Sequence, residues 1–139
     1  MAQRVGLAVA TRFYGKTAED LKRLDRWIDA AVEVSSICLV AVDPARDQSG
    51  ALDYLVRRNG VTAFSVIPWG EFTPALNALV LEAFNRGGNR ILFASVAFPP
   101  RPEIVNKLDE YFNVSSDTTL VVGALLSGLD FRRSSLSDN

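Results

Sequence analysis

Five short apolar segments, separated by longer segments of helical periodicity, dominate the pattern of hydrophobic and polar positions along the chain. Within each apolar segment, hydrophobic residues occupy consecutive positions instead of alternating with polar ones. This pattern is typical of strands that are buried on both faces, as in a parallel sheet covered by helices. It predicts strands at residues 5–10, 37–42, 62–67, 91–98 and 119–126.

Helical periodicity fills the segments between these strands. Apolar residues recur there at every third or fourth position, so they line one face of a helix. The four faces are formed by Leu21, Leu24, Ile28, Ala31 and Val32, by Leu52, Leu55 and Val56, by Leu76, Leu79, Val80, Ala83 and Phe84, and by Ile104, Leu108 and Phe112. Each predicted helix therefore carries an apolar stripe that a sheet can bury.

Residues at the ends of these segments agree with the predicted helices. Thr17 is predicted to cap the first helix, with Asp20 completing a variant of the capping box three residues later. Thr73 is predicted to cap the third helix because Pro74 follows it. Gly87 suits the left-handed residue that ends the same helix.

Strands and helices alternate in the order βαβαβαβαβ. Right-handed crossovers between parallel strands put helices on both faces of the sheet, which predicts an α/β three-layer sandwich with a mainly parallel sheet. A flavodoxin-like sheet has the same order and is the alternative fold. Residues 1–126 form the predicted domain, and residues 127–139 form a polar tail or the start of an incomplete element.

Composition removes several classes of function. The chain has 139 residues, enough for one domain with a buried core, and it contains no histidine and a single cysteine, Cys38. These counts exclude histidine-based catalysis, an intrachain disulfide and nearly all zinc sites. The 15 basic and 16 acidic residues are interspersed and leave a formal net charge of −1, so the sequence does not predict a nucleic-acid partner.

No segment of the sequence predicts export or membrane insertion. The apolar run at residues 5–10 is too short for the core of a signal peptide or for a membrane span. Cys38 lies inside the apolar run 37–42, where a buried thiol is expected. We therefore expect a cytoplasmic protein with no membrane partner.

The loops after the predicted strands are the places where chemistry is expected, because ligands of open parallel sheets bind beyond the carboxyl ends of the strands. The first of these loops contains Thr11, Arg12, Phe13, Tyr14 and Lys16. It has neither the glycine-rich turn of a dinucleotide site nor the Gly-Lys-Ser/Thr of a phosphate loop. Arg12 and Lys16 are candidates to hold an anion, and the alternative is that both are solvated loop cations.

Other candidate residues follow the later strands. Asp43 ends the second strand, where its carboxylate can accept from a ribose hydroxyl or a base N–H, or else start a turn before a proline. Trp69 can stack on a base or a sugar ring, or cover the core. Asn77, in the first turn of the third helix, can bond a ligand or brace a loop. Ser95 is the hydroxyl of the fourth strand, and Asp47 is predicted to cap the second helix.

Five strings of the sequence, taken with the order of the elements, carry a family resemblance. They are Val5–Thr11, Leu39–Asp43, Thr73–Ala78, Ala83–Phe93 and Val121–Gly123. Together they resemble the N-terminal, nucleotide-binding half of family 2 glycosyltransferases, over about residues 4–126. The resemblance implies the A-type nucleotide-diphosphosugar transferase fold.

The resemblance also implies roles for particular residues. Asp43 would contact the nucleoside, the residues from Thr11 to Tyr14 would line the base pocket, and Asn77 matches the family's asparagine on the third helix. The family's Asp-x-Asp motif, which binds the metal and the diphosphate, would end the fourth strand, where this chain has Ser95–Ala97. Both carboxylates are absent, so no metal cofactor is expected, and the acceptor half is absent as well.

These features leave three functional hypotheses. The first is a glycosyltransferase-like domain that binds a nucleotide or nucleotide sugar, with catalysis weak or lost. The second is a transferase that is metal-independent or completed by other sequence, with Arg12, Lys16 or Arg101 clamping the donor. The third is a non-enzymatic interaction domain. An unpaired edge strand invites pairing, so a homo-oligomer or a partner protein is also expected.

Overall fold

The computed structural model describes residues 4–114, 119–124 and 131–135 and divides into two compact units, residues 1–100 and 101–139. The first unit contains a four-stranded sheet with the strand order β3-β2-β1-β4. Its elements are β1 (Leu7–Phe13), α1 (Ala18–Val34), β2 (Ile37–Val42), α2 (Ala51–Val56), β3 (Thr62–Ser65), α3 (Thr73–Asn85) and β4 (Arg90–Phe93).

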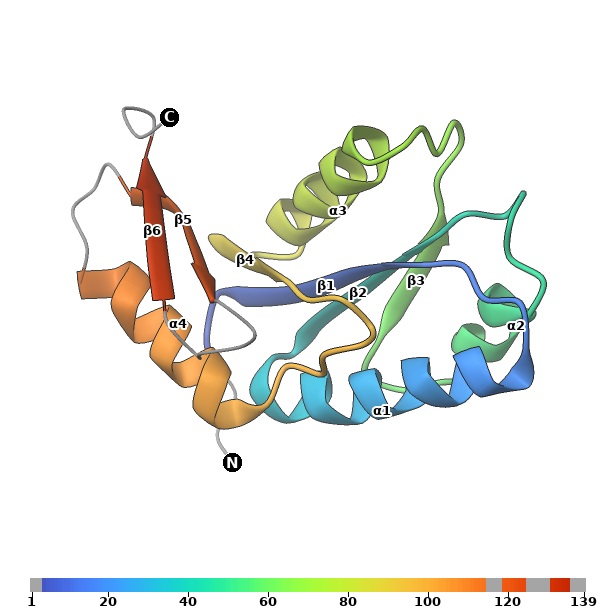
Figure 1. Cartoon of the computed structure of the whole chain (residues 1–139), viewed down its shortest axis with the longest axis horizontal. Helices are drawn as coiled ribbons and strands as arrows, with labels where there is room; N and C mark the ends of the chain where they lie inside the picture. Colours follow the sequence, from blue (N-terminus) through green and yellow to red (C-terminus); the bar gives the residue numbers. More distant parts are fainter. Residues whose placement is uncertain (1–3, 115–118, 125–130, 136–139) are drawn as a thin grey trace. The chain divides into compact units, whose positions relative to one another are not determined.

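All four strands of this sheet run parallel, and β1 lies between β2 and β4. The chain moves outward from β1 to β2 and β3 and then returns across the sheet to β4. Right-handed crossovers in opposite directions cover opposite faces, which puts α1 and α2 on one face and α3 on the other (Figure 1). The predicted α/β arrangement of helices on both sides of a parallel sheet is therefore confirmed for this unit.

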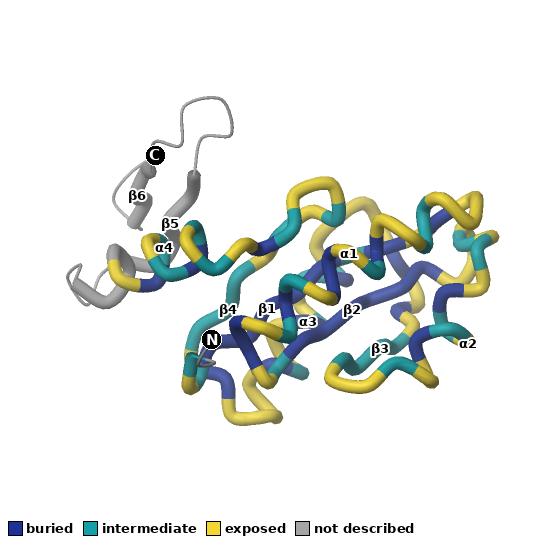
Figure 2. Tube along the Cα trace, turned by 90° about the horizontal axis from the view of Figure 1, so that it is seen from below, coloured by how far each residue is buried: buried dark blue, intermediate teal, exposed yellow. Residues whose placement is uncertain are grey.

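Burial explains the continuous apolar runs of the central strands. Every residue of the runs 7–10 and 38–42 is buried, whereas β3 and β4, at the edges of the sheet, are only half-buried (Figure 2). The edge strands are also shorter than predicted. β4 ends at Phe93 because the chain turns at Ser95, whose carbonyl accepts from the N–H of Phe98 at 2.9 Å.

The helix starts show one confirmed cap and one that differs. Thr17 Oγ1 accepts from the N–H of Asp20, and the Asp20 carboxylate accepts from the N–H of Thr17, which completes the predicted capping box. Thr73, by contrast, is the first residue of α3, and Phe72 occupies the cap position without a side-chain hydrogen bond. Pro74 lies in the first turn of α3, where its missing N–H leaves no bond unmade.

The carboxyl end of α3 closes in a Schellman motif. The N–H of Gly88 donates to the carbonyl of Ala83 at 2.8 Å, and the N–H of Gly87 donates to that of Phe84 at 3.1 Å. Gly87 has a φ of 92°, which favours glycine because a Cβ is strained there. The predicted role of Gly87 is confirmed.

Two apolar layers hold the helices to the sheet. On one side, Leu24, Trp27 and Ile28 of α1 are fully buried, and Leu24 and Ile28 each contribute about 1.5–3 kcal/mol by leaving water. On the other side, α3 packs through Leu79 and small residues onto alanines of the central strands.

Cys38 is buried as predicted, and burial raises the pKa of its thiol to about 12, which leaves it protonated and unreactive.

The second unit contains α4 (Pro102–Val114), β5 (Thr119–Ala124) and β6 (Phe131–Ser135). The predicted fifth strand exists, but it pairs antiparallel with β6 in a two-stranded sheet and does not belong to the parallel sheet. Only residues 125–130 separate β5 from β6, and so short a connection suits antiparallel pairing. β6 lies in the predicted tail, whose residues 127–130 and 136–139 lie outside the described residues.

None of the helices in the described ranges combines the length and the apolar character that crossing a membrane requires.

Candidate functional site

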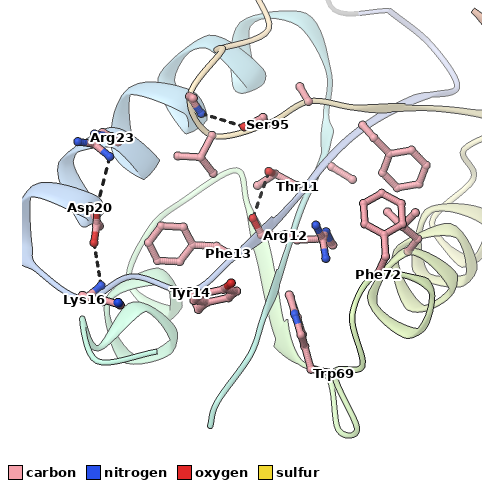
Figure 3. A pocket seen from close by; sticks show the side chains of 16 residues that line it. Thr11, Arg12, Phe13, Tyr14, Lys16, Asp20, Arg23, Trp69, Phe72 and Ser95 are labelled. Atoms are coloured by element: carbon pink, nitrogen blue, oxygen red, sulfur yellow. Dashed lines mark hydrogen bonds and ion pairs between the residues drawn. The ribbon is translucent and has the colours of Figure 1, made fainter. Parts of the chain in front are cut away.

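A cavity of about 550 Å³ opens beyond the carboxyl ends of β1 and β4, entirely within the first unit. The crossovers of the sheet reverse direction between these two strands, which is the switch point where open parallel sheets bind ligands. Three segments line it: the end of β1 with the start of α1, the loop before α3 with the first turns of that helix, and the chain that leaves β4 (Figure 3).

Aromatic side chains form one part of the cavity wall. Tyr14 and Trp69 meet edge to face with their ring centroids 6.3 Å apart, and Phe72 and Phe93 also line the cavity. Trp69 is 6% exposed and also packs into the core beneath α3, so it both covers the core and faces the cavity. Tyr14 is 43% exposed, and the guanidinium carbon of Arg46 lies 5.5 Å from its ring centroid, so only the part of the ring that Arg46 and Trp69 leave uncovered is open to a ligand.

Arg12 lies against this aromatic wall. Its guanidinium carbon is 4.3 Å from the ring centroid of Phe72 and 5.9 Å from that of Trp69, and Nη1 donates to the carbonyl of Glu71 at 3.0 Å. Within the part of the chain that the structure describes, no carboxylate pairs with Arg12. Stacking therefore orients this cation without neutralising its charge.

The start of α1 supplies the charged part of the lining. The Asp20 carboxylate accepts from the N–H groups of Lys16 at 2.7 Å and Thr17 at 3.2 Å, and these hydrogen bonds hold its pKa below the ordinary value. Arg23 Nη1 lies 3.5 Å from Asp20 Oδ1, so Asp20 partly compensates Arg23. The ammonium of Lys16 has no partner among residues 4–114, 119–124 and 131–135.

Asp43 lies outside the set of residues that line the cavity. Its side chain is buried, with Oδ1 accepting from the N–H of Ala45 at 3.0 Å and Oδ2 lying 3.5 Å from Nε of Arg46. This is the geometry of the turn alternative, in which an aspartate before a proline bonds to the backbone two residues on.

Asp47 locks the loop after β2 to the loop after β1. Its Oδ1 accepts from the N–H of Gly15 at 2.8 Å and from Ser49 Oγ at 2.7 Å, and its Oδ2 accepts from the N–H of Ala51 at 3.0 Å. The last bond reaches the first residue of α2, but the cap position is held by Gly50 and not by Asp47, so the predicted cap is wrong. Burial raises the pKa of Asp47, but the hydrogen bonds outweigh burial and hold the pKa below the ordinary value.

The other predicted residues divide between the cavity and the surface. Thr11, Arg12, Phe13, Tyr14, Trp69 and Ser95 line the cavity, whereas Asn77 is exposed on α3 and does not. Ser95 Oγ accepts from the N–H of Ala97 at 3.2 Å and shapes the turn after β4.

Sequence reasoning did not single out the lining residues Asp20, Arg23, Phe72 and Phe93 as site residues. Phe72 had a usable signal, since it belongs to the loop after β3. Arg23 lies two helical turns beyond the loop after β1, and nothing in its local sequence indicates that it reaches a cavity.

No three potential metal ligands are gathered in one place among the described residues. Ser95–Ala97, where the glycosyltransferase motif would fall, bring no carboxylate to the cavity.

The chain matches no protein-family model, no curated protein and no solved structure. The comparisons therefore identify no family, and the resemblance to glycosyltransferases stays an expectation. The case for a function rests on the cavity itself.

Proposed function

We propose that the cavity binds a nucleotide or nucleotide sugar and that the chain is a glycosyltransferase-like binding domain with catalysis weak or lost. The observation that carries the proposal is a cavity at the switch point of a parallel sheet, lined by aromatic rings and by cations. Its volume of about 550 Å³ falls in the range that holds a ligand of this size.

The two kinds of lining suit the two ends of a nucleotide. The exposed ring of Tyr14, beside Trp69, offers a face or an edge to a planar base. Arg12 and Lys16 offer positive charge to phosphate. The strand order β3-β2-β1-β4 matches the first four positions of the doubly wound order 3-2-1-4-5-6 of nucleotide-binding sheets, and it supports the nucleotide-diphosphosugar-transferase-like fold as part of the proposal.

The proposal of weak or lost catalysis rests on the acidic residues. Asp20 is the carboxylate among the described lining residues, and backbone N–H groups and Arg23 already engage it. A transferase needs a general base for its acceptor, and a carboxylate held in this way is poorly suited to take a proton. A transferase completed by other sequence remains the alternative.

A thermal-shift panel tests the proposal. The full chain is heated with UDP, GDP, CDP, dTDP and their common sugar conjugates, each with and without Mn²⁺. A nucleotide at 100 times its Kd is expected to stabilise the fold by roughly 2.7 kcal/mol. Tyr14→Ala is expected to weaken that shift, whereas Phe84→Ala, which removes an exposed aromatic outside the cavity, is expected to keep it.

No shift with any nucleotide would overturn the proposal and favour the interaction-domain hypothesis. A shift that needs Mn²⁺ would contradict the absence of a metal cofactor, while leaving nucleotide binding in place.

A further inference from the structure

The charged and aromatic parts of the cavity lining occupy different places around it. Figure 3 shows Trp69, Phe72 and Arg12 on one side and Lys16, Asp20 and Arg23 on the other, with Tyr14 between them. Because side chains alternate along β1, Arg12 shares the α3 face with Ala8 and Ala10, whereas Lys16 lies beyond the strand in the loop between β1 and α1.

We infer that the cavity selects its ligand by phosphate charge and compensates that charge with Lys16 and Arg12, without a divalent ion. The inference rests on the proposed nucleotide function and adds the ligand class: a nucleoside diphosphate or its conjugate, in preference to a nucleoside. The base lies on the aromatic side, and the phosphates extend from Arg12 towards Lys16.

The charge balance of the lining carries the inference. Its charged members are Arg12, Lys16, Arg23 and Asp20, and the ion pair between the last two leaves Arg12 and Lys16 uncompensated. Two uncompensated cations facing one cavity favour an anion more than a neutral molecule. The Asp20 carboxylate accepts from the N–H groups of Lys16 and Thr17 and contacts the Arg23 guanidinium, and among the described residues it makes no ion pair with the Lys16 ammonium.

Lys16 is the specificity-determining residue in this arrangement. Its N–H donates to Asp20, which fixes the backbone at the mouth of the cavity, while its ammonium has no partner in the described ranges. Arg12 already bonds to the Glu71 carbonyl and stacks on Phe72, so part of its donor capacity is committed. Lys16 therefore offers all three of its donors to a phosphate.

Calorimetric titration of the full chain, in EDTA and separately with Mn²⁺, tests the inference. The probes are UDP, GDP, CDP and dTDP, the four matching nucleosides, and inorganic pyrophosphate. The nucleotide that binds is expected to do so roughly tenfold or more tightly than its nucleoside. Lys16→Ala is expected to cost the diphosphate roughly tenfold in affinity, to leave the nucleoside unchanged and to flatten the dependence of affinity on salt. Lys16→Arg is expected to restore binding.

Lys22→Ala is the matched control, because Lys22 is an exposed lysine of α1 that lies outside the cavity lining. Three outcomes would overturn the inference and leave nucleotide binding in place. They are equal affinity for diphosphate and nucleoside, binding that requires Mn²⁺, and unchanged diphosphate affinity in Lys16→Ala. If pyrophosphate binds in a Lys16-dependent way and no nucleotide or nucleoside binds, the proposed function fails and the anion site stands. Binding of none of the probes, either in EDTA or with Mn²⁺, would overturn both.

Discussion

The loops that follow β1 and β2 end neighbouring central strands at the same edge of the sheet, but they use their polar side chains in opposite ways. After β2, the carboxylates of Asp43 and Asp47 are engaged by backbone N–H groups and nearby side chains. After β1, Tyr14 and Lys16 turn towards the cavity, and Lys16 keeps a free ammonium among the described residues.

The difference shows how one loop supports another. Gly15 donates its N–H to Asp47 and accepts from the N–H of Gln48 at 2.7 Å, so the loop after β1 is held by the loop after β2. Side chains that satisfy the backbone make a rigid scaffold, and the side chains mounted on it remain available for a ligand. Variants in the two loops are therefore expected to separate effects on stability from effects on binding.

Removal of Asp47 is expected to have the largest effect. Asp47→Ala leaves the N–H groups of Gly15 and Ala51 without their acceptor, which we expect to lower the free energy of unfolding by about 3 kcal/mol. Chemical denaturation measures the change, and Asp53→Ala, at an exposed aspartate of α2, serves as control. A loss below about 0.5 kcal/mol would contradict the scaffold role.

A side chain at Gly15 is expected to disturb the contact between the loops that follow β1 and β2. A Cβ there would lie 2.7 Å from Phe13 Cζ and 2.9 Å from Asp20 Cβ, so Gly15→Ala is expected to lower the free energy of unfolding by about 2 kcal/mol. The neighbouring Lys16→Ala, at an exposed residue, is expected to change it by less than about 0.5 kcal/mol. Equal losses of unfolding free energy for the two variants in denaturation experiments would contradict the view that Gly15 supports the loop and Lys16 does not.

Loss of the Asp43 carboxylate is expected to affect stability more than binding. Asp43→Ala removes the acceptor for Ala45 and the ion pair with Arg46, which we expect to lower the free energy of unfolding by about 1.5 kcal/mol. The thermal shift produced by a nucleotide is expected to persist, because Asp43 does not line the cavity. If the variant folds but no longer binds, Asp43 has the nucleoside role that the resemblance implies.

The smallest expected effect is on the pH dependence of stability. Because the folded-state pKa of Asp47 lies below its ordinary value of 3.8, its stabilising contribution is present above that value and is lost as the pH falls through the lowered pKa. The free energy of unfolding, measured by chemical denaturation from neutral pH to about pH 2, is therefore expected to change less with pH for Asp47→Asn than for the wild type. Asp20 has a lowered pKa as well and keeps part of the dependence in the variant. The same pH dependence in the variant and the wild type would show that Asp47 does not contribute to the pH dependence of stability.

The elements that have local causes could be predicted from the residues alone. Consecutive apolar residues marked the buried strands β1 and β2, and the Thr17–Asp20 capping box and Gly87 marked helix ends. These features depend on neighbours along the chain, so the pattern of residues contains them. The loop after β1 was predictable as a site for the same reason, because a parallel sheet places its sites after its strands.

Which polar side chains reach the cavity depends on contacts between segments that are distant in the sequence. Asp43 and Lys16 both follow central strands, yet one turns back onto its own loop and the other faces the cavity. Phe72 and Arg23 join the lining from segments far apart in the sequence, and β5 pairs with β6 instead of extending the parallel sheet. These outcomes depend on which distant segments meet and on which hydrogen bonds satisfy the buried backbone. The local spacing of residues along the chain predicts neither the contacts nor the hydrogen bonds.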